Sequence, residues 1–105
     1  MATIISTDDN FEKLKKDHKN LLIDFWAPWC SPCVQISPVL EQISEEMKDV
    51  TIAKHNVEEE LNTPTKVSVR GLPTMILFVN GEQKAVKTGA TNKADLVDFL
   101  EKNKG

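Results

Sequence analysis

The feature that most constrains the fold of this chain is an apolar run, LLIDFWA at residues 21–27, that leads almost directly into the only two cysteines. Nearly every residue of the run is apolar, so it lacks the alternation of a strand with one side facing water. Such a run predicts a central strand that is buried on both faces. The cysteines follow within WAPWCSPCVQISP, residues 26–38, at the end of this strand.

Apolar positions on either side of the run predict further strands and helices. After the cysteines, apolar residues at 36, 39, 40, 43 and 47 recur at helical spacing. Pro38 lies inside this pattern and is expected to kink the helix, because it removes a backbone donor. Other strands are predicted at 3–6, 50–57, 74–79 and 82–88, and other helical segments within 7–20, 58–67 and 91–104.

Several residues carry the signals of turns and helix starts. Thr7 or Asp8 is expected to cap the first helix, and Thr91 or Asn92 the last. Pro64 is expected to interrupt the helical turns at 58–67. Asn80-Gly81 between two strand patterns predicts a type I′ hairpin, and Lys84 and Lys87 suit an outermost strand, where charge discourages edge pairing.

The resulting order, β-α-β-α-β-α-β-β-α, defines the expected fold class. Helices between the early strands imply parallel pairing there, whereas the hairpin must be antiparallel. The sequence therefore predicts an α/β protein with a mixed central sheet of about five strands and helices on both faces. Its 105 residues fit a single domain over 1–105.

Charge and hydropathy argue against several functional classes. The net charge is −3 and the lysines are scattered, so no nucleic-acid partner is expected. No apolar stretch approaches the roughly 20 residues of a membrane span. The N-terminal MATIISTDDN lacks the features of a signal peptide, which predicts a cytoplasmic protein. Cysteines in that reducing compartment are more often catalytic or metal-binding than structural.

The spacing of the two cysteines suits redox chemistry. A cysteine at the start of a helix meets free backbone N–H groups and the positive end of the helix dipole. These favour the thiolate and lower the thiol pKa. A second cysteine one turn along can close a disulfide and release a bound substrate. We therefore assign Cys30 as the attacking thiol and Cys33 as the resolving thiol.

Two other interpretations of the pair are weaker. A tetrahedral zinc site needs four ligands, and only His18 and His55 remain as nitrogen donors, without the spacing of a zinc finger. A structural disulfide across so short a loop removes little chain entropy and would be reduced in the cytoplasm. Neither interpretation uses the residues around the pair.

DFWAPWCSPC, followed later by RGLPT and TGA, resembles the thioredoxin family, in its small single-domain bacterial form. The similarity runs from about Ile4 to the last helix. It implies a thioredoxin fold and a thiol-disulfide oxidoreductase that reduces protein disulfides. It also implies client proteins with disulfides, a thioredoxin reductase that uses NADPH, and a monomer. No bound cofactor is expected, since the chain lacks a glycine-rich dinucleotide loop.

Asp24 interrupts the apolar run, on the same strand face as Leu22 and Trp26. Burial of a carboxylate is costly and raises its pKa, which suits a proton acceptor for Cys33. Its position resembles that of the buried aspartate of thioredoxins, and Lys54 matches a lysine that lies near it in the family. The alternatives are a strand-end aspartate that reaches solvent and a lysine that extends its amine to water.

The resemblance also implies a surface that docks clients. Pro73 matches a proline that has a cis peptide bond and lies against the cysteines in thioredoxins. Lacking an N–H, it would leave the preceding backbone free to pair with an extended peptide. Trp29, Leu72, Gly89 and Ala90 match the rest of that surface. For each of these residues a plain turn or packing role stays open.

Two positions depart from the family. Ser31 and Pro32 stand between the cysteines, where thioredoxins usually carry Gly-Pro. The Ser31 hydroxyl is a candidate donor to the thiolate, which would make the protein more oxidising, while steric effects can act the other way. Val34 replaces a common lysine or arginine, which leaves the surface more apolar.

Two alternatives to a disulfide reductase stay open. The same site run in the opposite direction would give an oxidase or isomerase, against which the missing signal peptide argues. A binding subunit would use the docking surface without turnover, and would not need Cys30.

Overall fold

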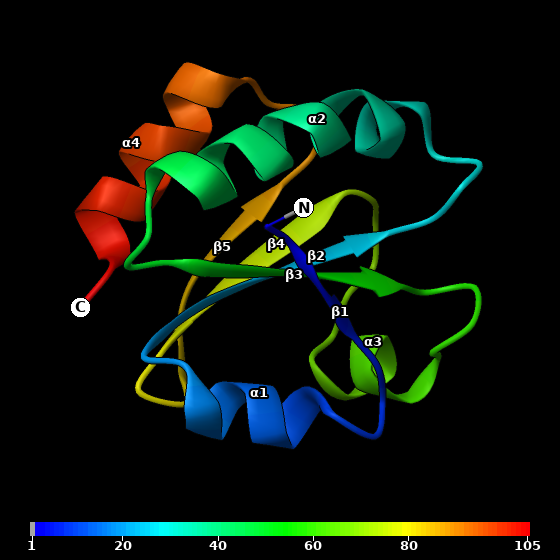
Figure 1. Ribbon diagram of the computed structural model, residues 1–105. Coiled ribbons are helices and arrows are strands. Elements are labelled where there is room, and N and C mark those ends of the chain that lie inside the picture. The colour runs from blue at the N-terminus through cyan, green and yellow to red at the C-terminus, as the bar shows by residue number, and fades with distance from the viewer. Residues whose placement is uncertain (1) are drawn as a thin grey trace.

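The computed structural model describes residues 2–105, and Figure 1 shows a sheet between two layers of helices. The order of strands and helices is the one predicted from the sequence. The elements are β1 (Ile4–Ser6), α1 (Phe11–Asp17), β2 (Asn20–Trp26), α2 (Ser31–Glu46), β3 (Thr51–Asn56), α3 (Asn62–Lys66), β4 (Thr74–Val79), β5 (Glu82–Thr88) and α4 (Lys93–Asn103).

The sheet has five strands in the order β1-β3-β2-β4-β5, which places β2 at its centre. β3 pairs with β1 and β2 in parallel, whereas β4 pairs with β2 and β5 in antiparallel fashion. The expected mixed sheet is therefore confirmed. α2 and α4 cover one face, and α1 and α3 cover the other (Figure 1).

The central strand β2 is buried on both faces, as its apolar run predicts. Leu22 joins a core with buried residues of α2 and α4, including Leu40 and Leu96. Ile23, on the opposite face, joins a second core with Phe11 of α1. Because alternate residues of β2 enter different cores, any polar side chain in this strand is enclosed by one or the other helical layer.

The hairpin between β4 and β5 follows the expected turn chemistry. Asn80 has φ 52° and Gly81 has φ 83°, the left-handed conformations that both central residues of a type I′ turn require. β5 lies at the edge of the sheet, so Lys84 and Lys87 are on an outermost strand as predicted. Asn92 caps α4 by accepting the N–H of Asp95 at 2.9 Å, which confirms one of the two predicted caps.

Of the two caps predicted for the first helix, Thr7 is confirmed and Asp8 is not. α1 begins at Phe11, and in the turn before it the Oγ1 of Thr7 accepts the N–H of Asn10 at 3.1 Å, while the Asn10 side chain accepts the N–H of Thr7 at 2.7 Å. Asp8 instead accepts the N–H groups of Asn62 at 3.1 Å and Thr63 at 2.8 Å, and so caps α3. The chain folds these segments together across more than 50 positions, and local sequence carries no sign of that contact.

Proline interrupts neither of the helices that contain it. Pro64 is the third residue of α3, so the expected interruption was wrong. The first N–H groups of a helix have no acceptor within it, and proline is tolerated there because it lacks only a group that would stay unpaired. α2 continues through Pro38 from Ser31 to Glu46. Within residues 2–105, no helix is long and apolar enough to cross a bilayer.

We predict that Asp8→Ala lowers the free energy of unfolding by about 1–2 kcal/mol, since two N–H groups at the start of α3 lose their acceptor. Chemical denaturation measures the change. Asp9→Ala is the matched control, because Asp9 is the exposed neighbour. Equal stabilities of the two variants would contradict the capping role of Asp8.

Candidate active site

The two cysteines lie where the chain leaves β2 and starts α2. Cys30 is the N-cap residue of α2, with an extended backbone, and Pro32 occupies the first turn. The Sγ atom of Cys30 accepts the N–H of Cys33 at 3.3 Å. The two residues form a disulfide with their Cα atoms 5.2 Å apart. The structure thus places Cys30 at the helix N-terminus, as the spacing predicts.

The disulfide is shielded from solvent. Cys33 is 1% exposed and Cys30 is 5% exposed, and both pack with Ala27. The neighbouring Trp29 is 67% exposed, which marks the accessible side of the pair. Cys33 is therefore closed off from solvent, and Cys30 presents only a small part of its surface.

The loop before β4 packs against the disulfide from the other side. The Leu72–Pro73 peptide bond is cis, as the family resemblance implies, and Pro73 is buried. Leu72 packs against the cluster that contains both cysteines. The N–H of Gly89 donates to the carbonyl of Pro73 at 2.9 Å, which ties the end of β5 to the same loop.

Two shallow grooves are lined by residues that are next to the cysteines in the sequence. The first lies between Trp29 and Leu72. The second lies between Pro32 and Ala90. Of the residues that the resemblance assigns to client docking, Leu72 packs against the cysteine cluster, and the others lie on the segments that flank these two grooves.

Asp24 lies in the middle of β2, beside Lys54 of β3 and Met75 of β4. It is fully buried, and within residues 2–105 neither of its carboxylate oxygens has a hydrogen-bond partner. Burial raises the pKa of Asp24 to about 7, and the positive charge of Lys54 opposes part of that rise. The alternative of an aspartate that reaches solvent or a backbone donor is excluded by these contacts.

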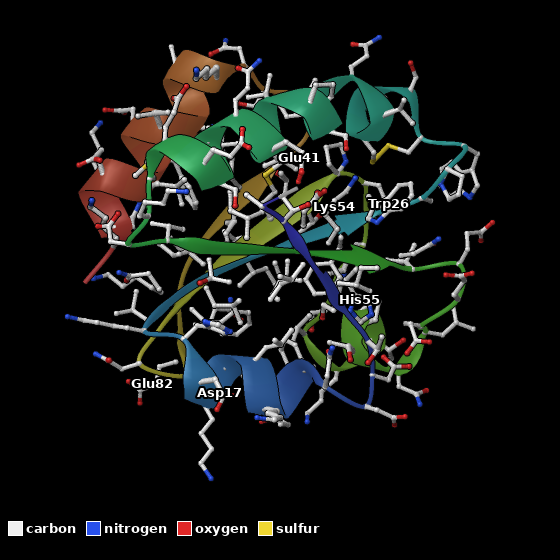
Figure 2. All side chains as sticks on the ribbon, viewed as in Figure 1. Asp17, Trp26, Glu41, Lys54, His55 and Glu82 are labelled. Carbon is white, nitrogen blue, oxygen red and sulfur yellow. A yellow bond between two sulfur atoms is a disulfide. The ribbon has the colours of Figure 1, made fainter. Side chains whose placement is uncertain are left out.

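Lys54 approaches this region without forming an ion pair with Asp24. Its Nζ donates to the Oγ of Ser37 on α2, and it lies 4.6 Å from the centroid of the Trp26 ring. Figure 2 shows Trp26, Lys54 and Glu41 in the space between α2 and the sheet. Trp26 is partly buried there, against the cluster of the cysteines. The Lys54 amine is therefore held against α2 and Trp26, and the residue is only partly exposed to water.

Ser37 was missed by the sequence analysis. It follows Cys33 by four residues, so both lie on one face of α2, and Glu41 continues that face. This spacing was the available signal, but a serine among apolar positions also suits an ordinary helix surface. Ser31, which was singled out, is exposed, and its Oγ accepts the side-chain N–H of Gln35 at 3.4 Å.

No cluster of metal-ligating side chains occurs within residues 2–105. His18 and His55 lie in separate places. The ring of His18 contacts the hydroxyl of Thr51, whereas His55 is buried with its Nε2 3.0 Å from the carbonyl of Glu60. His55 lies on the side of the sheet away from α2 (Figure 2).

A Cys-x-x-Cys disulfide at the start of a helix, next to a central strand that carries a buried carboxyl group, defines a thiol-disulfide oxidoreductase. Comparison with known proteins agrees. The family model for thioredoxin matches residues 2–102. The chain belongs to the thioredoxin family.

Similar proteins cover nearly the whole chain. A thioredoxin of Acidithiobacillus ferridurans is 45% identical over 102 residues, which are 95% of this chain and 94% of the relative. A thioredoxin of Buchnera aphidicola subsp. Acyrthosiphon pisum (strain APS) is 46% identical over 99 residues, 92% of each chain. A solved structure of a mutant thioredoxin from Halobacterium salinarum NRC-1 superposes with a TM-score of 0.89 at 31% identity, over 98% of this chain and 90% of that one. The expected thioredoxin fold and oxidoreductase activity are confirmed.

We predict that Asp24→Asn stabilises the protein, and more at pH 8 than at pH 5. The pKa of Asp24 is about 7 in the folded state and 3.8 in its unperturbed state. Between these values the unfolded chain loses the proton and the folded chain keeps it, so the stability of the parent falls as pH rises. The variant lacks this loss, which is on the order of a few kcal/mol.

Denaturation at several pH values measures this difference. Asp9→Asn, at an exposed aspartate, is the control and should follow the parent. A stability gain from Asp24→Asn that does not grow between pH 5 and pH 8 would show that Asp24 is ionised throughout.

Proposed function

We propose that this protein reduces disulfides in client proteins through a reversible Cys30-Cys33 pair, with Cys30 as the nucleophile. The placement of Cys30 as the N-cap of α2 carries the proposal. The N–H of Cys33 points at the Cys30 sulfur and would stabilise a thiolate there. A stabilised thiolate at Cys30 makes this sulfur the nucleophile of the reaction.

In the first step the Cys30 thiolate attacks one sulfur of the client disulfide. A new S–S bond joins Cys30 to the client, and the other client sulfur leaves as a thiolate that takes a proton from water. In the second step the Cys33 thiolate attacks the Cys30 sulfur and displaces the client. The client gains two electrons and two protons, and the protein is left with its own disulfide.

Asp24 serves the second step as the acceptor of the Cys33 proton. Cys33 is almost fully buried, so its proton cannot pass directly to bulk water. The Asp24 carboxyl lies on the face of the sheet that α2 covers, and its pKa of about 7 suits proton exchange near neutral pH. Lys54 supports this role through its positive charge.

Clients dock on the surface around Trp29, Leu72, Pro73, Gly89 and Ala90. This surface is supported by the exposure of Trp29 and by the two grooves that Trp29, Leu72 and Ala90 line. An extended client segment next to its own cysteine suits such a shape, because its backbone can pair with the loop at Leu72. Val34, 51% exposed, adds apolar area beside the pair.

The partners follow from the family. Members of the thioredoxin family act on disulfide-containing proteins and are returned to the dithiol state by a reductase. We propose a thioredoxin reductase that draws on NADPH, so that NADPH acts indirectly and this protein binds no cofactor of its own. A monomer in the cytoplasm, without nucleic-acid or membrane partners, fits this role.

We predict opposite behaviour of the two cysteine variants in a reductase-coupled assay of insulin reduction. Cys30→Ser should be inert, because no thiolate starts the reaction. Cys33→Ser should accumulate a covalent adduct with the client, seen by mass spectrometry, because nothing resolves it.

Further measurements on the same variants and on the parent separate the alternatives. Equilibration of the parent against glutathione gives its redox potential. An oxidase or isomerase has a higher, more oxidising potential than a reductase. A binding subunit would keep its biological role in the Cys30→Ser variant. Adduct formation by Cys30→Ser instead of Cys33→Ser would reverse the assigned order of attack.

We also predict that Ser31→Gly changes the redox potential. Within residues 2–105 the Ser31 oxygen accepts from Gln35, and its own proton is free to turn toward Cys30 when the pair is reduced. One hydrogen bond of about 1.4 kcal/mol corresponds to about 30 mV for a two-electron couple. Glutathione equilibration of parent and variant measures the shift, and equal potentials would remove Ser31 from the redox chemistry.

A further inference from the structure

A cleft of about 410 Å³ lies between α2 and the strands at the β1 edge of the sheet. Its walls include Trp26, Ser37, Glu41 and Lys54. Figure 2 shows three of these residues in the space between the helix and the sheet. None of them belongs to the surface proposed for client docking. The cleft brings a charged amine close to the buried strand that carries Asp24.

Lys54 and Asp24 are direct partners in the pairing of β2 with β3, yet they do not touch. Among residues 2–105 the Asp24 oxygens have no hydrogen-bond partner, and the Lys54 amine bonds to Ser37 instead. The ring of Trp26 lies on another side of the amine, at 4.6 Å. A cation next to an unpaired buried carboxylate is strongly attracted to it, so something must hold the amine back.

We propose that Ser37 is a positioning residue whose hydroxyl holds the Lys54 amine against Trp26 and out of contact with the Asp24 carboxyl group. This inference rests on the proposed role of Asp24 as the acceptor of the Cys33 proton. A carboxylate in contact with the amine would be a weaker base. Ser37 leaves Lys54 near enough to favour ionisation of Asp24, and far enough away for the carboxyl group to exchange a proton with Cys33.

No other side chain that lines the cleft can supply the positive charge that Lys54 places near Asp24. From α2 come the Cys33 thiol and Glu41, while β4 presents the uncharged Met75. Glu59 and Glu60 line the cleft beyond β3. Among the side chains that line the cleft, Lys54 is the one cation.

Without the Ser37 hydroxyl, two groups with oxygens that lack a hydrogen-bond partner within residues 2–105 are candidate acceptors for the amine. One is the carboxylate of Asp24, and the other is Oε2 of Glu41. Glu41 already accepts hydrogen bonds from Thr3 through its other oxygen, whereas neither oxygen of Asp24 is paired. Asp24 is also the more deeply buried, so contact with the amine is worth more there. The amine should therefore move toward Asp24.

The test is the pH dependence of the resolving step. Reaction of the reduced protein, in excess, with 5,5′-dithiobis(2-nitrobenzoic acid) releases two thionitrobenzoate ions, the second through attack by Cys33. Stopped-flow absorbance follows this second phase across pH. Ser37→Ala should lower the apparent pKa of the phase by about one unit. Lys54→Met, which removes the cation, should raise the apparent pKa.

Two control variants separate the positioning effect of the Ser37 hydroxyl from a general disturbance of α2. Ser37→Thr keeps a hydroxyl and should follow the parent profile. Ser44→Ala removes a different serine of α2, which is buried, and should also leave the profile unchanged. Titration of the Asp24 carboxyl carbon by ¹³C NMR in the reduced protein gives the same shift directly, in case the two kinetic phases merge in a variant.

Asp24→Asn separates failure of this inference from failure of the proposed function. If Asp24→Asn keeps the parent pH profile, Asp24 is not the acceptor, and both its proposed role and the positioning role of Ser37 are wrong. If Asp24→Asn loses the inflection but Ser37→Ala keeps the parent value or raises it, only the positioning role of Ser37 is overturned. A downward shift in Ser37→Ala that vanishes in the Asp24→Asn background supports both.

Discussion

The burial of β2 between two helical layers is the constraint on which the remaining structure depends. Leu22 enters the core under α2 and α4, and Ile23 enters the core over α1. The strand thereby fixes the direction in which the chain leaves the sheet, and Cys30 follows only four residues after its end. A disulfide at the start of α2 is positioned by this packing rather than by a flexible loop.

The same burial creates the chemical reactivity of the site at a cost in stability. Asp24 occupies a place in β2 where an apolar residue would pack without penalty, and its carboxyl group has no hydrogen-bond partner within residues 2–105. The raised pKa is the physical expression of that cost. A carboxyl group that is poorly solvated and titrates near neutrality suits proton exchange with a buried thiol, so function and stability conflict at this residue.

Sequence predicted correctly those features that depend on residues close together in the chain. The Asn80-Gly81 turn follows from the left-handed conformations that these two residues tolerate, and Asn92 caps α4 through a bond to a residue three positions away. Prediction failed where a contact joins distant segments. Asp8 caps α3 rather than α1, and Ser37 bonds to Lys54 across 17 positions, between a helix and a strand.

The sequence by itself determined the fold class, the order of the elements and the chemistry of the cysteine pair. Those properties depend on apolar periodicity, turn residues and the spacing of two thiols, which can be read along the chain. Tertiary structure alone decided which charges meet, that Asp24 has no hydrogen-bond partner among residues 2–105, and where the Lys54 amine lies. Those outcomes depend on the distances between packed elements, because the pKa of a buried group is set by its burial and its neighbours in space.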